Sequence, residues 1–261
     1  MIPFWLRKSH ELSAHKQWSE SYHWLETLTQ RPGSELPALA TRCLSTLRTL
    51  GWNSIDPSTG IYSSRLCELI SEQPLSSSII DAMIKTTTHR VHNSTSHPGI
   101  YIASLEISFY LKHARLFEGY IHERMFSALR KLGVKLTSGT VNVLYIPVNV
   151  RDIHWAVFRV DLSTHFISYG DSLGWKPVTE DVERIQWWLG TLGFSPFGIQ
   201  GDLPHACQPV SDSVSCGIIM VNTIRHNCFG DHLWSFDDHE IFRLREFLGL
   251  TGVSAVCVLN F

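Results

Sequence analysis

The sequence lacks three features: a long uninterrupted apolar run, an excess of charge of one sign, and a closely spaced cysteine pair. No apolar run reaches the length that spans a bilayer, and residues 1–10 carry charges where a secretory signal has its apolar core. The formal net charge is −2 and the basic residues are scattered, which argues against a surface for nucleic acid or anionic membranes. We therefore expect an intracellular protein, in the cytoplasm or nucleus, with neither nucleic acid nor membrane as partner.

The composition is that of an ordinary globular protein. Of its 261 residues, 44% are hydrophobic and 18% charged, which is enough to bury a sizeable core. The six cysteines form no CxxC pair, and a chain of this size does not need disulfides for stability. Free thiols are therefore expected.

The first fifty residues predict amphipathic helices. Leu36, Leu39, Cys43 and Leu47 recur at helical spacing, and Gly51 is suited to end a helix. Residues 53–64 contain an Asp-Pro-Ser-Thr-Gly turn signal, which indicates a linker. We expect a helical extension over residues 1–60 and a second domain over residues 61–261.

The second domain alternates between helical and strand-like patterns. A short helix is expected at residues 75–84, then a polar surface loop at 86–99, and a helix with Ile121, Met125 and Leu129 that ends in a left-handed cap at Gly133. Three runs rich in Val, Ile and aromatic residues predict a strand meander. These runs are residues 141–150, 153–160 and 166–169, and further helices are expected at 179–192, 216–228 and 237–250, before a short apolar tail.

Cys216 is the candidate nucleophile. It precedes Gly217, which permits close approach of another chain, and it opens an apolar helical run whose N-terminal dipole would stabilise a thiolate. The thiolate is the reactive form of cysteine. The alternative is a small buried side chain at the start of a core helix.

His154 and Asp171 are the candidate base and orienting acid. His154 lies in a strand-like run, where rigid backbone would hold a general base, and Asp171 ends the next run. A hairpin between the runs would bring the carboxylate to the imidazole, where it would fix the tautomer and stabilise the imidazolium. Each residue also has a structural alternative: His154 could be a hydrogen-bonded strand histidine, and Asp171 could be a turn former.

Three motifs together resemble the ubiquitin-like-protein-specific cysteine proteases of the Ulp and SENP group. The first is Val-Leu-Tyr-Ile-Pro-Val at 143–148 followed by His-Trp-Ala at 154–156; the second is Tyr-Gly-Asp-Ser-Leu at 169–173. The third is Gln-Pro at 208–209 followed by Ser-Cys-Gly at 215–217. With a weaker start at residues 74–81, the similarity covers residues 74–228.

The resemblance implies an α+β, papain-like core in which a helix carries the cysteine and a short mixed sheet flanked by helices carries His and Asp. It implies hydrolysis of the C-terminal tail of a ubiquitin-like protein, most similar to SUMO, or of its conjugate, by Cys216, His154 and Asp171. Gln208 would donate to the oxyanion, although its interval to Cys216 is two residues longer than in the family. Trp155 would cover the channel for a Gly-Gly tail, and Pro74 stands where the family has a second tryptophan.

Other functions stay open at this point. The chain could be a catalytically silent module that binds a ubiquitin-like protein, or an acyltransferase of related fold, although such relatives usually carry Glu as the third member. A metal hydrolase could use His154, Asp171, His205 and Cys207, which are acceptable zinc ligands. The spacing His205-x-Cys207 matches no recognised ligand pattern, so we expect neither metal nor cofactor.

Overall fold

A computed structural model of the chain describes residues 2–33, 35–52, 61–95, 98–114 and 117–252. The chain divides into two compact units. Unit 1 comprises Met1–Thr86, Ser213–Ile218 and Trp234–Phe261, and unit 2 comprises Thr87–Asp212 and Ile219–Leu233. The sheet lies in unit 2, whereas unit 1 is helical.

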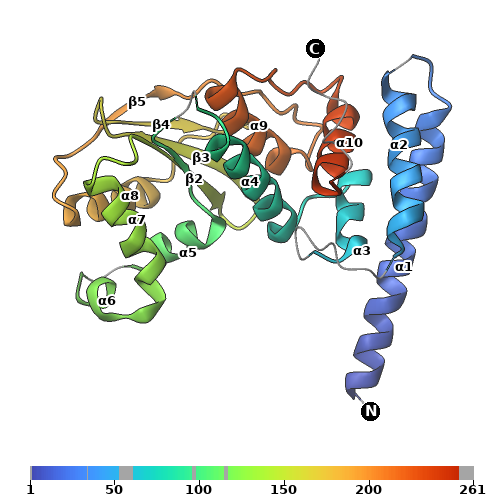
Figure 1. Ribbon diagram of the computed structural model, residues 1–261, viewed down its shortest axis with the longest axis horizontal. Helices are drawn as coiled ribbons and strands as arrows, with labels where there is room; N and C mark the ends of the chain where they lie inside the picture. Colours follow the sequence, from blue (N-terminus) through green and yellow to red (C-terminus); the bar gives the residue numbers. More distant parts are fainter. Residues whose placement is uncertain (1, 34, 53–60, 96–97, 115–116, 253–261) are drawn as a thin grey trace. The chain divides into compact units, whose positions relative to one another are not determined.

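Unit 1 is built around two long helices and the last helix of the chain. In Figure 1, α1 and α2 run side by side. On α2, Leu39, Cys43 and Leu47 are buried at helical spacing, and this helix packs against α10. The expected N-terminal helices are thus confirmed, and Gly51 after α2 has the expected left-handed backbone, with φ of 68°. The elements are α1 (Ile2–Thr29), α2 (Glu35–Leu50), α3 (Ser63–Leu66), η1 (Cys67–Ile70), the start of α4 (Ser77–His92) and of α9 (Cys216–Phe229), and α10 (His239–Leu250).

The expected linker falls mostly outside the described residues, which resume at residue 61. The expected domain boundary near residue 60 therefore stays a prediction. Within unit 1, however, the segment before the expected linker contacts α10: Arg31 pairs with Glu240 at 2.7 Å, and the Cys43 thiol of α2 lies 3.7 Å from the Leu244 carbonyl oxygen. The apolar tail also lies outside the described residues.

Helix α4 is longer than the sequence pattern indicates, and the expected loop over residues 86–99 is wrong for its first half. Thr87 and Val91 are buried on one face of the helix. The Thr87 hydroxyl oxygen accepts a hydrogen bond from Arg225, and Arg90 forms a bidentate ion pair with Asp231. These contacts of unit 2 stabilise a helical turn that a Thr-rich and His-rich sequence does not favour by itself.

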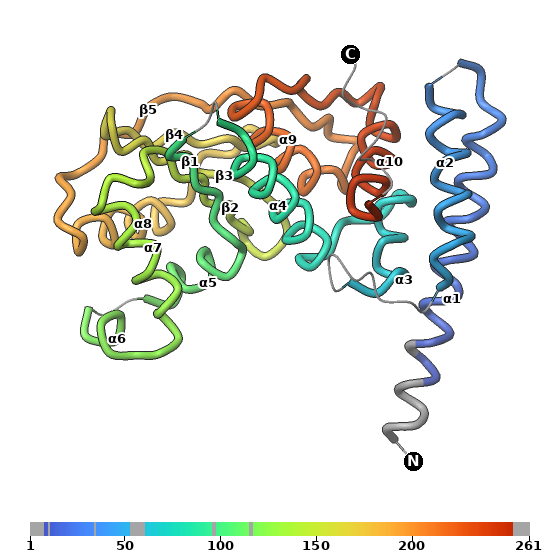
Figure 2. The backbone as a smooth tube through the Cα atoms, in the orientation of Figure 1, coloured from blue at the N-terminus to red at the C-terminus, as the bar shows by residue number. Residues whose placement is uncertain are grey.

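Unit 2 is organised by a five-stranded mixed sheet in the order β1-β2-β3-β4-β5. The meander of β2, β3 and β4 is antiparallel, as expected, and parallel strands flank it on both sides. The trace in Figure 2 follows the chain from β4 through α8 to the edge strand β5. The strands are β1 (Ile100–Ile102), β2 (Val143–Val150), β3 (His154–Asp161), β4 (Phe166–Gly170) and β5 (Gly198–Asp202).

Helices cover the sheet of unit 2. Alternate residues of β2 and β3, including Ile146, Val148 and Phe158, form one core with helices on that face. On the opposite face Gly170 lies so close to α9 that an added Cβ would be 3.2 Å from Thr223. The α+β prediction with a short mixed sheet is confirmed. The helices of the first face are α5 (Leu105–His113), α7 (Ser127–Thr137) and α8 (Thr179–Thr191), and α6 (Phe117–His122) and η2 (Arg124–Phe126) join α5 to α7.

Gly133 is not the helix cap that its spacing indicates. It lies inside α7, where an added Cβ would be 2.7 Å from a methyl group of Leu192. The left-handed glycine comes after the helix, at Gly139 with φ of 71°. Gly133 therefore permits close packing rather than chain reversal.

Within the described ranges, no helix combines the length and apolar character needed to cross a bilayer.

Candidate active site

His154 and Asp171 meet at one end of the meander. The register pairs Val157 with Gly170, the last residue of β4, and continuing it by one step would place Asp171 opposite Ala156. His154 lies two residues from Ala156 on the same side of β3, which makes it the diagonal neighbour of the carboxylate. Nε2 of His154 is 2.9 Å from Oδ1 of Asp171, and both side chains are buried. The contact predicted from the hairpin is therefore present.

Asp171 is held as a carboxylate. Burial alone would raise its pKa, but hydrogen bonds from His154, Tyr169 and the backbone N–H of Leu173 outweigh burial and lower the pKa below its ordinary value. The Tyr169 hydroxyl donates to Oδ2 at 2.8 Å, and the Leu173 N–H donates to Oδ1 at 2.8 Å. The charged form is thus favoured, and its two oxygens have fixed directions.

This arrangement selects the tautomer of His154. Because an ionised carboxylate only accepts hydrogen bonds, Nε2 carries the proton in the neutral ring. The lone pair then lies on Nδ1, as a general base requires. The pair can thus take up a proton on Nδ1 and stabilise the imidazolium that results.

Gln208 forms two hydrogen bonds with Ser172, the residue after Asp171. Its backbone N–H donates to the Ser172 carbonyl oxygen at 2.7 Å, and the Ser172 hydroxyl donates to Oε1 at 3.0 Å. Nε2 donates to the carbonyl oxygen of Asp212 at 2.7 Å, which closes a turn in which Val210 points fully into solvent. Since an amide nitrogen has two hydrogens, Nε2 can offer a second donor.

Two tryptophans lie beside this pair in unit 2. Trp155 follows His154 on β3, so its side chain points to the opposite face of the sheet, where it is half-buried. Trp175, which the motif analysis did not select, packs its ring 5.1 Å from the His154 ring. The sequence signal was present, since Trp175 lies only four residues after Asp171.

Cys216 belongs to unit 1 and is the first residue of α9. Ser215, Cys216 and Gly217 are all buried. The start of a helix bears a partial positive charge that favours a thiolate. The predicted helix beginning at this cysteine is confirmed.

Other cysteines are poorer nucleophiles. Burial raises the pKa of the Cys43 and Cys67 thiols to about 12 and that of Cys228 to about 11. These thiols are protonated at neutral pH and therefore unreactive. Among the described cysteines this leaves Cys216 and the exposed Cys207 as candidates.

Arg243 fixes the backbone near Cys216 within unit 1. Its guanidinium, only 1% exposed, donates to the carbonyl oxygens of Glu68 and Ser71, and to those of Gln73 at 2.9 Å and Val214 at 3.3 Å. Gln73 precedes the exposed Pro74, and Val214 lies two residues before the cysteine. One buried cation therefore joins both segments. Arg243 lies in no recognisable motif, so the sequence alone does not single it out.

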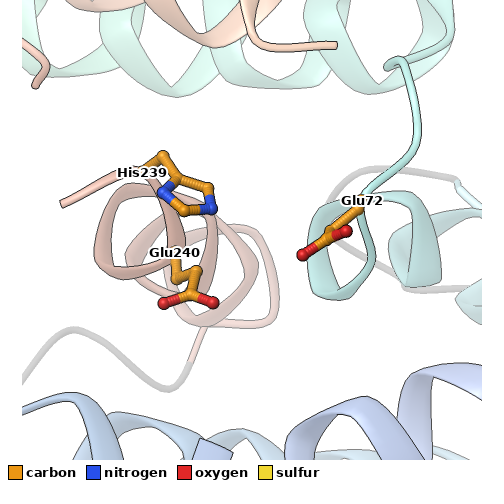
Figure 3. A group of neighbouring side chains, drawn as sticks. All are labelled: Glu72, His239 and Glu240. Carbon is orange, nitrogen blue, oxygen red and sulfur yellow. The ribbon is translucent and has the colours of Figure 1, made fainter. Parts of the chain in front are cut away.

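One cluster in the described part of the chain has the composition of a metal site. Figure 3 shows Glu72 facing His239 and Glu240 of α10, with ligand atoms within 4.8 Å of one another. The buried Glu240 carboxylate already accepts a hydrogen bond from Arg31 at 2.7 Å. We interpret Glu240 as a structural residue, because it lies in the first turn of α10, where the helix dipole favours an acidic side chain. Of the four residues considered for the alternative metal hydrolase, His205 lies 2.5 Å from the Leu203 carbonyl oxygen through Nδ1, and Cys207 is exposed.

No protein-family model matches the sequence, and no curated protein matches it. Solved structures do match. SUMO protease Ulp1, in a form with its catalytic cysteine oxidised to a sulfonic acid, aligns with a TM-score of 0.61 and 19% identity over 85% of this chain and 98% of that chain. The Ulp1 protease domain in complex with Smt3, the yeast orthologue of SUMO, aligns with a TM-score of 0.53 and 19% identity over 89% and 95%. The Ulp1-like SUMO protease catalytic domain of Chaetomium thermophilum aligns with a TM-score of 0.59 and 13% identity over 85% and 91%.

The alignments cover nearly the whole of the matched chains, 98% and 91% of their lengths. At this level of sequence identity such a likeness establishes architecture. The papain-like expectation drawn from the motifs is confirmed, and the chain has the fold of the Ulp1-type proteases.

Proposed function

We propose that the protein is a cysteine peptidase that cuts the C-terminal tail of a ubiquitin-like protein, with Cys216 as nucleophile, His154 as base and Asp171 as orienting acid. The observation that carries the proposal is the buried His154–Asp171 hydrogen bond at 2.9 Å in a chain with a Ulp1-type fold. Three donors, from His154, Tyr169 and the Leu173 N–H, hold the Asp171 carboxylate in one direction relative to the imidazole. Cys216 at the start of α9 is the matching nucleophile.

In the proposed reaction, Nδ1 of His154 accepts the Cys216 proton and the thiolate attacks the carbonyl carbon before the scissile bond. The carbonyl oxygen becomes an oxyanion, which the Cys216 N–H and the Gln208 side-chain amide stabilise. The intermediate collapses as the imidazolium donates its proton to the leaving amine, and a thioester remains. Water, deprotonated by His154, then attacks the thioester, and the thiolate leaves with the tail free as a carboxylate.

The substrate class is supported by the occupants of related structures and by one side chain. The matched Ulp1 domain is in complex with Smt3, the yeast orthologue of SUMO. Trp155 is half-buried on β3 directly after the proposed base, and an indole there can cover an extended glycine tail. We therefore propose a SUMO-like protein or its conjugate as partner and no cofactor.

A panel of ubiquitin-like proteins carrying C-terminal vinyl sulfones tests the nucleophile and the partner together. We expect a covalent adduct with at least one SUMO-like probe, and none with Cys216→Ala, which removes only a thiol at a helix start. Cys207→Ala is the matched control, because Cys207 is an exposed thiol and its variant should react as the wild type does. An adduct that persists in Cys216→Ala contradicts the assignment.

The same assays separate the alternatives. A silent binding module would bind the partner without forming an adduct, and an acyltransferase would form a labelled thioester with acetyl coenzyme A. Release of the free tail from a peptide or isopeptide bond, lost in Cys216→Ala, is the result expected for the peptidase.

A further inference from the structure

We propose that Trp175 is a positioning residue that covers the His154–Asp171 hydrogen bond, excludes water from it and holds the imidazole in its reactive orientation. The inference rests on the proposed function for its catalytic consequence, but not for its structural part. It begins with the contact between two rings whose centroids are 5.1 Å apart at an interplanar angle of 57°. At this distance the indole contacts the imidazole closely enough to limit its rotation about χ2.

The chain between Asp171 and Trp175 forms a tight turn. The Gly174 N–H donates to the Asp171 carbonyl oxygen at 2.9 Å, and Leu173 N–H donates to the Asp171 carboxylate. Gly174 has a φ of 68°, in the left-handed region that disfavours other residues. The turn therefore begins with the residue that binds one edge of the imidazole and ends with the residue that packs on the ring.

A second turn of unit 2 supports the indole. Arg151 and Asp152, with φ of 54° and 60°, form the left-handed centre of the β2–β3 hairpin, closed by the Ile153 N–H on the Val150 carbonyl oxygen at 3.2 Å. The guanidinium carbon of Arg151 lies 5.6 Å from the centroid of the Trp175 ring, within cation–π range. Trp175 thus contacts side chains from the hairpin turn and from β3.

Exposure distinguishes this indole from a core residue. Trp175 is 37% exposed, whereas His154 and Asp171 are each 2% exposed. A side chain that remains partly in solvent while its neighbours are dry acts as a cover over them. A hydrogen bond to a charged group is stronger when water is excluded. We therefore expect the Trp175 indole to keep the Nε2–H bond of His154 aligned with the Asp171 carboxylate, which leaves Nδ1 on the side of the ring away from Asp171.

Exchange of the His154 Nε2 proton with water tests the cover directly, without any substrate. In protein with nitrogen-15 histidine, the Nε2–H signal of His154 is identified by its loss in His154→Gln. We expect Trp175→Ala to accelerate its exchange at least about tenfold, while Trp175→Phe, which retains a ring, recovers most of the protection. Trp187→Ala is the matched control, because Trp187 is also half-buried in unit 2 but packs against Tyr120.

Kinetics with the identified tail substrate give the second readout. Trp175→Ala should lower kcat about tenfold with KM within about twofold, because it alters orientation of the base and not tail binding. Unchanged proton exchange in a folded Trp175→Ala variant overturns the proposal, even if kcat falls. If the wild type cuts no substrate, the proposed function fails, and the exchange measurement still decides whether Trp175 covers the pair.

Discussion

The two units hold their proposed catalytic residues by different means. In unit 2, His154 and Asp171 are fixed through side-chain atoms, by hydrogen bonds from Tyr169 and Leu173 and by ring packing from Trp175. In unit 1, Cys216 is fixed through the backbone. It is the first residue of α9, and the carbonyl oxygen of Val214, two residues earlier, accepts a hydrogen bond from Arg243. The tautomer and direction of the proposed base are thus controlled in unit 2, and the position of the proposed nucleophile is controlled in unit 1.

This difference follows from the chemistry each group performs. A base transfers protons along a defined axis, so the rotation of its ring must be limited. A sulfur atom is nearly isotropic, and the helix dipole acts on it through position alone. Substitutions in unit 2 should therefore reduce turnover, whereas those around Arg243 should reduce stability first.

The largest effect should come from Asp171→Asn. The amide can present an N–H to Nε2 and favour the wrong tautomer, so kcat should fall by about 10³–10⁴ with KM changed only a few-fold. Asp161→Asn is the control, because Asp161 is another buried aspartate of the same sheet whose pKa is lowered in spite of burial by bonds to Ser163 and Thr164 and by Arg159. Steady-state kinetics of both variants test this prediction. A kcat in Asp171→Asn equal to that of the wild type would contradict the assignment of Asp171 to the triad.

Arg243→Met should produce the largest loss of stability. It retains most of the volume but removes the donor of four carbonyl oxygens that the buried guanidinium joins, so the free energy of unfolding should fall by at least about 3 kcal/mol. Urea unfolding measures this. Arg245→Met on the same helix is the control: its pair with Glu35 is about half-exposed, and its loss should cost under about 1 kcal/mol. Equal losses in the two variants would mean that Arg243 does not fix the segment before Cys216.

Gln208→Ala should lower kcat by about 10²–10³, the effect of removing one oxyanion donor. Gln186→Ala provides the comparison, because Gln186 exchanges two hydrogen bonds with the Phe197 backbone and should affect stability alone. A kcat near the wild-type value in Gln208→Ala would leave Gln208 as the residue that closes the 208–212 turn.

The smallest effect should be the discrimination between tails. With Trp155 as one wall and Pro74 offering no second indole, tails ending in Gly-Gly and Ala-Gly should be cut at rates within about tenfold. Pro74→Trp should sharpen the preference. Competition between tail variants on the substrate found by the probe panel measures this, and equal cutting of a tail ending in Phe would show that no channel selects glycine.

What could be foreseen from the sequence depended on distance along the chain. His154 and Asp171 are joined by one hairpin, so alternating strands with a short turn were sufficient to predict their contact. Arg243 binds carbonyl groups as much as 175 residues away. Every residue has a backbone carbonyl group, so the identity of the accepting residues does not indicate these contacts. The short strand β1 and the glycine-containing, fully exposed strand β5 were also missed, because neither alternates apolar and polar residues.

Two errors in the helices have the same origin. The second half of α4 is polar by composition, yet its Thr87 and Val91 face other elements of unit 2, and only that packing identifies the turn as helical. A glycine at the end of a helical pattern, as at Gly133, is compatible with either a positive φ or a close approach of another residue. The structure selects the second because Leu192 lies against it.

That contact between Gly133 and Leu192 constrains how the chain can vary. The two residues are 59 positions apart in sequence, yet the leucine methyl occupies the space that any larger residue at 133 would need. Alanine at position 133 would require the Leu192 methyl groups to move, and a larger residue would require a shorter side chain at position 192. Natural or selected variants with a bulky residue at one position should therefore carry a smaller residue at the other, although neither position belongs to the proposed catalytic set.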